Sequence, residues 1–496
     1  MHFSSFFILT LVVSFLESWP AYAVTDQNNK NNDEAVEIAV IGGGIGGTSC
    51  SHFLRELFGD AATISLFEPK AIGGRMATVE MAGRQYESGG SVLHEKNMYM
   101  NKFVEDYGLD VADSPSLNMG IYDGEEFVFE ESSFDIVNLL KLMWRYKLDF
   151  FYLNNRIDKM IEKFNSIYEI QDAGYAFSTP AKLLNAMDMT FMNYTKEPLA
   201  RVLKDDFGLS QRTIDELASV ATRDNYGQSV NMTAFAGLIS LAGVQPGLWS
   251  VFGGNKLVCE KLLNSSKATW VNEAVVKVEG AENGSYTLYW EDETSDGELK
   301  SKTFDIVIVA TPLHDKVSNI SFEGISPDIH NFHGEYQRTV ATFIRGTPNS
   351  TYFGKSTGGL PDQVLTTQDG NIPIRTLALK IPVDFASGSN EDIPNVYKMF
   401  SERPLSGNEI DVLFLNRSEV KVIDWRAYPN YSTNQKLPPY QLNEKLYYTS
   451  GLEWGASAME VGAISAKNVA LLAFQNWKNN SKMIDSYDNT TSRDEL

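Results

Sequence analysis

The chain of 496 residues has few of the side chains on which several protein classes depend. It contains 2 cysteines and 6 histidines. Two cysteines cannot build a disulfide framework, and no group of cysteines and histidines has the spacing of a zinc site. Basic residues number 42 against 64 acidic ones, which gives a formal net charge of −22. This balance indicates no nucleic-acid partner and argues against a polybasic attachment to anionic lipid.

Long apolar runs are also missing, with one exception at the N-terminus. Residues 6–16 form an apolar run of signal-peptide length, and Ala21-Tyr-Ala23 follows as a small-x-small cleavage pattern. The run is too short to span a membrane comfortably, although a permanent anchor is the alternative. We predict a signal peptide over 1–23, a disordered lead over 24–36, and no transmembrane segment after cleavage.

Two further features predict a protein of the secretory pathway. The chain ends in Arg493-Asp-Glu-Leu496, which is one residue away from a Lys-Asp-Glu-Leu retrieval signal and suggests the endoplasmic reticulum. It also carries ten Asn-x-Ser/Thr sequons, the acceptors of N-linked glycans. We set Asn231 aside because an apolar stretch surrounds it and suggests burial. The predicted glycosylation sites are Asn193, Asn264, Asn283, Asn319, Asn349, Asn416 and Asn430.

Glycine, by contrast, is concentrated where it carries information. An apolar strand over 37–41 runs into Gly42-Gly-Gly44-Ile-Gly-Gly47 and then an apolar helix. In a dinucleotide-binding turn, Gly42 permits the tight bend, Gly44 lets a pyrophosphate approach, and Gly47 lets the helix pack on the strand. The phosphates then lie at the helix N-terminus. A second strand, 63–67, ends in Glu68, an acid placed to bind the ribose hydroxyls. An ordinary tight turn is the alternative.

The order of segments predicts an α/β fold with a Rossmann-like domain assembled from distant pieces. A buried strand over 305–310 ends in Ala310-Thr-Pro312, and a strand–glycine–helix pattern returns over 447–477. Helices over 134–223 and strands from 270 onward lie between the N-terminal glycine unit and the closing helix. We therefore predict a dinucleotide-binding core over 37–130, completed by about 300–315 and 445–478, an α+β substrate domain over 131–445, and a polar tail over 479–496.

A second pair of glycines narrows the choice of cofactor. Gly73-Gly74-Arg75 places backbone and a guanidinium together near an anion, and arginine suits a pyrophosphate because it donates two parallel hydrogen bonds. Gly89-Gly90 forms another turn where backbone approaches a flat ligand. Simple NAD dehydrogenases have no reason to carry Gly-Gly-Arg here, whereas flavin amine-oxidase-like enzymes do. The pattern predicts FAD.

Several segments, taken in order, resemble the prenylcysteine oxidase family, also called prenylcysteine lyases. The resemblance covers nearly everything after the polar lead. It rests on the glycine turns named above together with Tyr86-Glu-Ser-Gly-Gly-Ser-Val92, Asn225-Tyr-Gly-Gln-Ser229, Gly247-Leu-Trp-Ser-Val251, Gly253-Gly254-Asn255, Asp424-Trp-Arg-Ala-Tyr-Pro429, Leu446-Tyr-Tyr-Thr-Ser-Gly-Leu-Glu453 and Ala456-Ser-Ala-Met-Glu460.

The resemblance implies non-covalent FAD and oxidation of the thioether of farnesyl- or geranylgeranyl-cysteine. Hydride loss from C1 of the prenyl chain, addition of water and collapse give cysteine and a prenyl aldehyde, and molecular oxygen becomes hydrogen peroxide. The flavin performs the hard step, so no triad or metal is expected. The family implies a lumenal, often lysosomal, site. Phe252, where we expect an acid, and Trp454-Gly455 depart from the family pattern.

The resemblance and the chemistry also suggest residues for the substrate. Arg223, Tyr226 and Gln228 are candidates for the amino and carboxylate groups of the cysteine, and Glu460 for placing water or meeting the ammonium. Gly451 and Gly462, in the closing strand–helix segment, are expected at the cofactor, with Gly462 aiming N–H groups at the flavin. An apolar slot is expected among Trp144, Phe150, Phe151, Phe235, Leu248 and Trp249, with simple core packing as the alternative.

Two other functions remain open on sequence. One is another flavin oxidase, acting on an amine or a polyisoprenoid. The other is a lumenal glycoprotein that carries prenyl lipids without turnover. Peripheral membrane contact also remains open, whereas a nucleic-acid partner is not expected.

Overall fold

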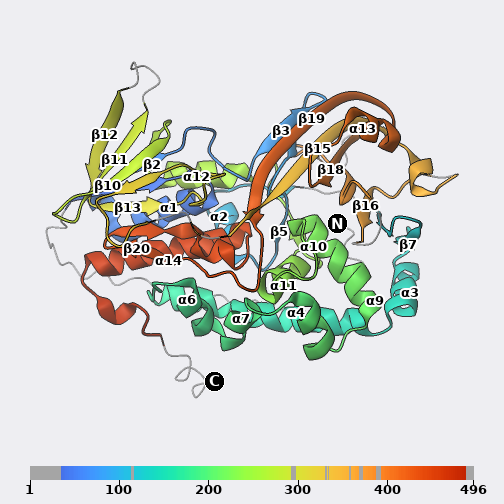
Figure 1. The fold of residues 1–496 in the computed structure, drawn as a ribbon, viewed down its shortest axis with the longest axis horizontal. Helices are drawn as coiled ribbons and strands as arrows, with labels where there is room; N and C mark the ends of the chain where they lie inside the picture. The colour runs from blue at the N-terminus through green and yellow to red at the C-terminus, as the bar shows by residue number, and fades with distance from the viewer. Residues whose placement is uncertain are drawn as a thin grey trace.

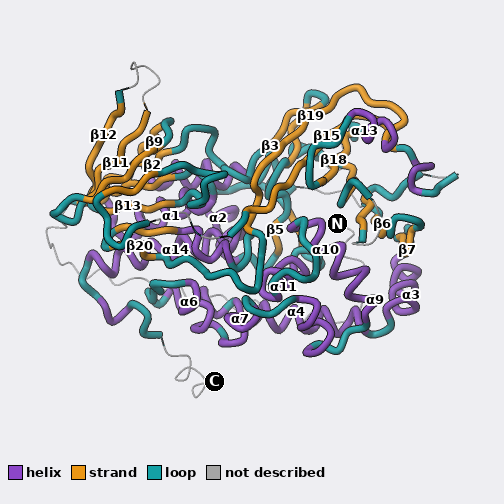
Figure 2. The backbone as a smooth tube through the Cα atoms, viewed as in Figure 1, coloured by secondary structure: helices purple, strands orange, loops and turns teal. Residues whose placement is uncertain are grey.

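The computed structural model describes residues 35–112, 117–291, 298–329, 332, 334–356, 359–367, 372–386 and 393–487. The predicted signal peptide, most of the lead and the Arg-Asp-Glu-Leu end lie outside these residues. Figure 1 shows two β-rich halves side by side, with a layer of helices running beneath them. Figure 2 makes the division plain, because the strands gather above and most helices below.

The first half is built on a six-stranded sheet with the order β20-β21-β13-β1-β2-β9. Strands β1 (Val36–Ile41), β2 (Ala62–Phe67), β9 (Thr269–Val271), β13 (Ile306–Val309) and β21 (Leu446–Tyr448) run parallel, and β20 (Gln441–Asn443) closes the edge antiparallel. The register pairs β1 with β13 from Ile38 opposite Ile306. The predicted Rossmann-like sheet, assembled from distant segments, is confirmed.

Helices cover one face of this sheet. Helix α1 (Ile45–Phe58) packs between α12 (Lys256–Ser266) and α14 (Met459–Trp477), which supply much of the largest apolar core. The other face meets a second sheet of β10 (Val275–Gly280), β11 (Tyr286–Glu291), β12 (Leu299–Phe304) and β14 (Ser321–Glu323). Because both faces are covered, β13 is apolar throughout and β1 is apolar apart from Glu37. Strand β9 and helix α12 come from residues that the sequence places in the substrate domain.

The second half contains a seven-stranded sheet with the order β19-β15-β18-β17-β16-β6-β7. A hairpin of β3 (Thr78–Met81) and β4 (Arg84–Glu87) lies against it, and Met81 and Tyr86 pack on Ala341, Phe343 and Val396. This hairpin follows directly from the first half, so it fixes the two halves together. The strands of the sheet are β6 (Met119–Tyr122), β7 (Phe127–Glu130), β15 (Tyr336–Pro348), β16 (Gln363–Thr366), β17 (Thr376–Leu379), β18 (Val396–Ser401) and β19 (Phe414–Pro429).

The helical layer confirms the helices expected over 134–223. Its first two members, α3 (Asp135–Tyr146) and α4 (Asp149–Phe164), are separated at Lys147, whose φ of 55° ends α3. The other α-helices of the described chain are α2 (Met98–Asp106), α5 (Ser166–Asp172), α6 (Pro180–Met187), α7 (Met189–Tyr194), α8 (Leu199–Arg201), α9 (Gln211–Thr213), α10 (Ser219–Tyr226), α11 (Ala234–Ala242) and α13 (Gly407–Leu413). Two short strands, β5 (Leu93–His94) and β8 (Leu248–Trp249), pair with each other.

Candidate functional site

The first glycine turn has the geometry that its sequence predicts. Gly42 has a φ of 116°, and a Cβ there would lie 2.9 Å from the carbonyl oxygen of Ala310 at the end of β13. A Cβ on Gly47 would lie 1.8 Å from the carbonyl oxygen of Gly42. Only glycine fits either position, since an L side chain would collide with backbone. These two residues hold β1, α1 and β13 together.

Gly44 differs, because a Cβ there would make only ordinary contacts, 3.8 Å from Gly73 and Gly74. The two glycine turns lie directly against each other: Gly44 and Gly73 form a β-bridge, and the Gly73 N–H donates to the Gly43 carbonyl at 2.9 Å. The first N–H with an acceptor inside α1 is that of Thr48, which donates to the Gly44 carbonyl at 3.0 Å. The N–H groups of the preceding turn are the free donors of the helix, and they favour an anion. This cradle fits a pyrophosphate.

Glu68 lies at the end of β2 beside the cradle. Its Oε2 accepts from the N–H of Gly43 at 2.9 Å, and its Oε1 accepts from the N–H of Lys70 at 3.0 Å. The acid is thereby fixed at the edge of the first glycine turn. This is the position from which a carboxylate reaches a ribose in dinucleotide-binding folds.

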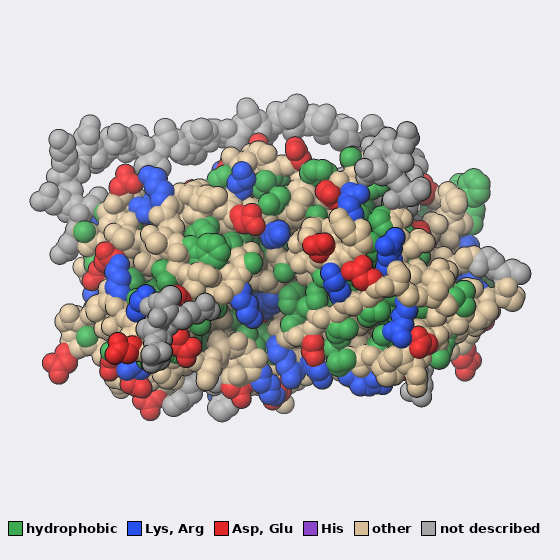
Figure 3. All heavy atoms as spheres, turned by 90° about the horizontal axis from the view of Figure 1, so that it is seen from above, with side chains coloured by type: hydrophobic (Ala, Val, Ile, Leu, Met, Phe, Trp, Pro, Cys, Tyr) green, Lys and Arg blue, Asp and Glu red, His purple; other side chains and the backbone are tan. Residues whose placement is uncertain are grey.

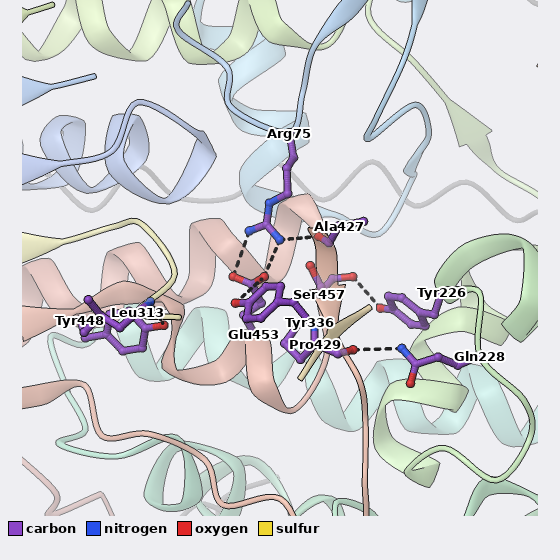
Figure 4. Close-up of polar contacts among 10 residues, drawn as sticks. All are labelled: Arg75, Tyr226, Gln228, Leu313, Tyr336, Ala427, Pro429, Tyr448, Glu453 and Ser457. Carbon is purple, nitrogen blue, oxygen red and sulfur yellow. Dashed lines mark hydrogen bonds and ion pairs between the residues drawn. The ribbon is translucent and has the colours of Figure 1, made fainter. Parts of the chain in front are cut away.

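Arg75 forms the strongest polar contact of the region (Figure 4). Its guanidinium donates to both oxygens of Glu453, at 2.5 and 3.0 Å, and to the Ala427 carbonyl at 2.6 Å. Tyr336 donates to the same carboxylate at 3.3 Å. Burial alone would lower the pKa of Arg75, but the charge and hydrogen bonds of Glu453 raise it. Glu453, to which the sequence assigns no role, thus ties the C-terminal segment to the second glycine turn.

Gly89 and Gly90 pack against that same loop. A Cβ on Gly89 would lie 1.9 Å from the Arg75 carbonyl oxygen and 2.6 Å from the Trp425 ring. The N–H of Gly90 donates to the Arg75 carbonyl at 3.0 Å, and Met459 at the start of α14 lies beside it. The turn that follows β4 is therefore a flat backbone surface between the two halves.

Two other glycines predicted to bind the cofactor are explained by packing. Gly451 is enclosed, with a Cβ position 2.8 Å from the Pro438 carbonyl oxygen. Gly462 faces Ile45 at the start of α1, and its N–H already donates to the Ala458 carbonyl at 3.0 Å. The expectation that Gly462 aims its N–H at the cofactor is corrected, because α14 begins at Met459 and its free donors precede Gly462.

Tyr226 and Gln228, predicted to meet the substrate, are held by backbone (Figure 4). The Tyr226 hydroxyl donates to the Ser457 carbonyl at 2.5 Å. Gln228 donates to the Pro429 carbonyl at 2.9 Å and accepts from the N–H of Tyr431 at 2.8 Å. Both side chains are buried. They join α10 and the loop after it to β19 and the C-terminal segment, which is a structural task.

Arg223 and Glu460 are likewise engaged. Arg223 donates to the carbonyl and the hydroxyl of Thr366, each at 3.0 Å, and its pKa is lowered by burial and then by the charge of Arg375. Glu460 accepts from the first N–H groups of α2, at 2.8 and 3.0 Å, and from the Tyr168 hydroxyl at 2.7 Å. Burial raises the pKa of Glu460 to about 7. Glu460 therefore anchors α2, and its expected role at water or the substrate ammonium stays a prediction.

The residues suggested for an apolar slot do not come together. Trp144 is 85% exposed on the outer side of α3, and Phe151 also faces outward. Phe235 is fully buried against Phe191, with ring centroids 5.7 Å apart. Trp249 lies on β8, which pairs with β5. The core alternative holds for Phe235.

Three charged residues near the glycine turns have no counterpart among the sequence predictions. Glu87 ends β4, Lys398 lies on β18 and is 2% exposed, and Lys380 follows β17. Burial raises the pKa of Glu87 to about 7, whereas burial and the charge of Lys380 lower the pKa of Lys398 to about 7. The sequence signal for this group is Lys398, a lysine between apolar neighbours in a strand. The sequence does not identify the charged residues near it, because they come from distant segments.

Comparison with known proteins agrees with this geometry. A Prenylcysteine lyase family model matches residues 129–486, and an NAD(P)-binding Rossmann-like domain model matches residues 40–107. The chain is 40% identical to prenylcysteine oxidase 1 of Bos taurus, covering 91% of each chain. It is 39% identical to the Homo sapiens protein of the same name, covering 90% of this chain and 91% of the relative.

Solved structures share the fold at low sequence identity. A putrescine oxidase double mutant superposes with a TM-score of 0.56 at 13% identity, over 89% of this chain and 99% of that one. Cyclohexylamine oxidase from Brevibacterium oxydans gives 0.55 at 14% identity, over 90% and 100%. The predicted amine-oxidase-like fold is confirmed, and the family supports the predicted FAD. On the family model and the full-length relatives together, this chain belongs to the prenylcysteine lyase family.

Proposed function

We propose that this chain is an FAD-dependent oxidase that cleaves the thioether of S-prenyl-L-cysteine in the degradation of prenylated proteins. S-prenylcysteine, molecular oxygen and water give a prenyl aldehyde, cysteine and hydrogen peroxide, and the atoms of this equation balance. The observation that carries the proposal is the 40% identity to prenylcysteine oxidase 1 over nine tenths of both chains. The relatives' printed name supplies the substrate class.

The residues present fit FAD. The backbone of Gly44 and Gly74, the free N–H groups of α1 and the carboxylate of Glu68 would hold its pyrophosphate and ribose. When bound, FAD supplies a two-electron acceptor for the carbon next to sulfur. Arg75 is held by Glu453 within the same region, so its positive charge is oriented before any cofactor binds.

The chain's own contribution is to position the substrate and exclude water. The Trp425 ring lies beside Gly89, and the Phe343 and Phe400 rings flank the Lys398 ammonium, which contacts the Glu87 carbonyl just before this turn. Such surroundings strengthen the electrostatic interactions inside the site and protect a reactive cation from bulk solvent. No catalytic triad is required, because bond breaking follows from loss of two electrons beside sulfur.

We also propose a lumenal location, in the endoplasmic reticulum or the lysosome. Six of the predicted glycosylation sites are exposed, and Asn349 is half-buried with its amide donating to the Val412 carbonyl at 2.9 Å. Asn231, expected to be buried, is exposed, which corrects its exclusion and adds it as a candidate. Glycan mapping after endoglycosidase treatment tests each site.

The outer face of α3 supports the proposal of peripheral membrane contact. Ile136, Leu140 and Trp144 recur every fourth residue along it, so they share one side of the helix, and exposed Leu148 follows at the start of α4. Exposed Lys141 and Lys147 lie nearby, as on helices that rest in a lipid interface. Among the described residues, no helix combines the length and apolar character that crossing a membrane requires. The exposed apolar residues of α3, the first turn of α4 and the residues beside them are Phe134, Ile136, Val137, Leu140, Met143, Trp144, Leu148, Phe151 and Tyr152.

Vesicle co-sedimentation tests this contact. The double variant Leu140→Ser, Trp144→Ser should lose binding to phosphatidylcholine vesicles, whereas Met189→Ser, which removes an equally exposed apolar side chain from α7, should keep it. Equal binding by all three proteins would refute contact through α3. Acidic and basic side chains are interspersed over the face seen in Figure 3, so charge does not mark a docking area there.

The activity itself is tested with the purified secreted chain in air. S-farnesylcysteine should give farnesal and hydrogen peroxide in equal amounts, and putrescine should give neither. A yellow protein that oxidises the amine but not the thioether would indicate another flavin oxidase. A colourless protein that binds farnesylcysteine without turnover would indicate a carrier.

A further inference from the structure

Lys398 occupies an unusual place for a charged side chain. It lies on a central strand of the seven-stranded sheet, opposite Phe343 on β15 and Ala378 on β17. Its ammonium lies 4.5 Å from the centre of the Phe400 ring and 3.5 Å from the carbonyl oxygen of Glu87. Glu87 is followed at once by the turn containing Gly89 and Gly90. The ammonium therefore lies beside the backbone surface that the cofactor is expected to approach.

Lys398 forms no ion pair within the described part of the chain, and the same holds for Lys380, which directly follows the neighbouring strand β17. The charges of Asp224 and Glu87 act on both lysines only from beyond ion-pair distance. The N–H of Lys380 donates to the Val396 carbonyl at 2.8 Å, and Lys398 lies opposite Ala378, so the two lysines lie diagonally across neighbouring segments. The charge of Lys380 is also one of the causes that lower the pKa of Lys398. Two adjacent ammonium groups in a poorly solvated place are unfavourable until an anion joins them.

Glu87 leaves an acceptor unused on the same side of the glycine turn. Its Oε1 accepts from the N–H of Asn255 at 2.6 Å, whereas its Oε2 is buried and has no partner. Asn255 in turn donates to the Gly90 carbonyl at 2.9 Å, which fixes the carboxylate relative to the turn. A buried carboxylate oxygen without a donor is costly, and an incoming N–H group would relieve that cost.

The other charged groups nearby are already occupied. Asp224 accepts from the Thr376 hydroxyl at 2.6 Å, Arg223 is bound to Thr366, and Arg375 pairs with Glu402 at 3.1 Å. Among the described residues, Glu87 and the two lysines are then available to a ligand and offer one negative and two positive charges, and Lys256 adds a further positive charge that acts on Glu87. A free α-amino acid carries an ammonium and a carboxylate on one carbon and matches this arrangement.

We propose that Lys398 and Lys380 bind the α-carboxylate of S-prenylcysteine and that Glu87 binds its α-ammonium. This inference rests on the proposed function and assigns its head-group recognition to residues other than Arg223, Tyr226 and Gln228. It explains how a thioether next to a free cysteine is distinguished from one in a peptide or a longer prenylated chain, because a peptide bond removes one of the two charges.

Binding measured by isothermal titration calorimetry on the holoenzyme, without oxygen, tests this assignment. The probes are S-farnesylcysteine, S-farnesylcysteamine, which lacks the carboxylate, and S-farnesyl-3-mercaptopropionate, which lacks the ammonium. For the unmodified chain, each truncated probe should bind about 10- to 100-fold more weakly, as expected for a lost charged hydrogen bond.

Variants then assign each charge. Lys398→Met should weaken the binding of S-farnesylcysteine to the level of S-farnesylcysteamine and leave the affinity for S-farnesylcysteamine unchanged. Lys398→Arg should restore part of the lost affinity. Glu87→Gln should make the affinities for S-farnesylcysteine and S-farnesyl-3-mercaptopropionate equal. Lys421→Met, on the half-exposed part of β19, is the matched control and should change nothing. Circular dichroism and flavin content confirm folding.

The outcomes separate this inference from the proposed function. If the unmodified chain oxidises S-farnesylcysteine but Lys398→Met keeps its preference for the carboxylate, the head-group assignment is wrong and the function stands. If the unmodified chain neither binds nor oxidises S-farnesylcysteine, the proposed function itself fails. A Lys398→Met protein that binds all probes normally but reduces its flavin slowly would also overturn the assignment.

Discussion

The glycine cradle and the charged group of Glu87, Lys380 and Lys398 are specified by different physical constraints. In the cradle, Gly42 and Gly47 are fixed by collisions with backbone at 2.9 and 1.8 Å, so side-chain size alone decides what is tolerated. Around Lys398, the backbone is an ordinary strand. This position is distinguished instead by an ammonium that has no carboxylate of the described residues within ion-pair distance. One region is specified by shape and the other by partners. Their responses to substitution should differ accordingly.

The largest effect is expected from Gly47→Ala. Its methyl group would overlap the Gly42 carbonyl oxygen, and that atom belongs to the turn joining β1 to α1. Because backbone cannot move aside cheaply, the cost should exceed the roughly 1–3 kcal/mol typical of overpacking. We expect little folded protein in thermal unfolding experiments.

Gly44→Ala is its matched control. Its methyl group has room, with no atom closer than 3.8 Å, so the apoprotein should fold with an unchanged melting temperature. The methyl group would project at the backbone surface where we place the pyrophosphate, so bound flavin should fall sharply. Equal flavin content in Gly44→Ala and the unmodified chain would remove the cradle from the cofactor site.

A strong effect is also expected from pH. Head-group binding needs Glu87 ionised and Lys398 protonated, and the pKa of each is shifted by burial to about 7. Below that pH Glu87 gains a proton, and above it Lys398 loses one, so kcat/KM for S-farnesylcysteine should peak near neutrality. The other charged groups that act on this pair are Lys256, Lys380 and Asp224.

The two limbs of this profile can be assigned separately. Glu87→Gln should remove the acidic limb, and Lys398→Met should remove the alkaline limb. S-farnesylcysteamine, which has no carboxylate, should show the acidic limb alone. A profile that keeps both limbs in both variants would move the titrating groups elsewhere.

A smaller effect is expected for Glu453→Gln. The change leaves the Arg75 guanidinium with a neutral partner and weakens the tie between the second glycine turn and the C-terminal segment. The guanidinium is partly exposed, so we expect a loss of about 1–3 kcal/mol in unfolding free energy rather than the larger cost of a fully buried pair. Urea unfolding measures it, and an unchanged midpoint would show that the pair is dispensable.

The smallest effect should come from Tyr226→Phe. Removing the hydroxyl leaves the Ser457 carbonyl without its donor and should cost about 0.5–1.5 kcal/mol of stability. The rate of flavin reduction at saturating S-farnesylcysteine should be unchanged, because the hydroxyl serves the backbone. A large loss of that rate with unchanged stability would restore Tyr226 to the chemistry.

Sequence reasoning reached the cradle because its evidence is local. Gly42, Gly44 and Gly47 follow an apolar strand, and the alternation of strand, turn and helix carries their meaning. The pairing of β1 with β13 joins segments that are far apart in the chain, since Glu37 and Asp305 are separated by 268 residues. It could also be predicted, because a fully apolar strand must be covered on both faces.

The polar half could not be predicted in the same way. Arg223, Tyr226 and Gln228 have the right chemistry, but their hydrogen bonds to Thr366, Ser457 and Pro429 arise only when distant strands meet. Glu460 has a carboxylate beside the cofactor segment, yet it serves the N-terminus of α2. Composition and spacing show which groups are present and not which of them are already paired.

Anaerobic titration of the purified holoenzyme with S-farnesylcysteine tests the central claim most directly. The claim predicts that the visible flavin absorbance bleaches stoichiometrically, and that admitting air restores it with one hydrogen peroxide per farnesal formed. A flavin that stays oxidised in the presence of bound S-farnesylcysteine would contradict it.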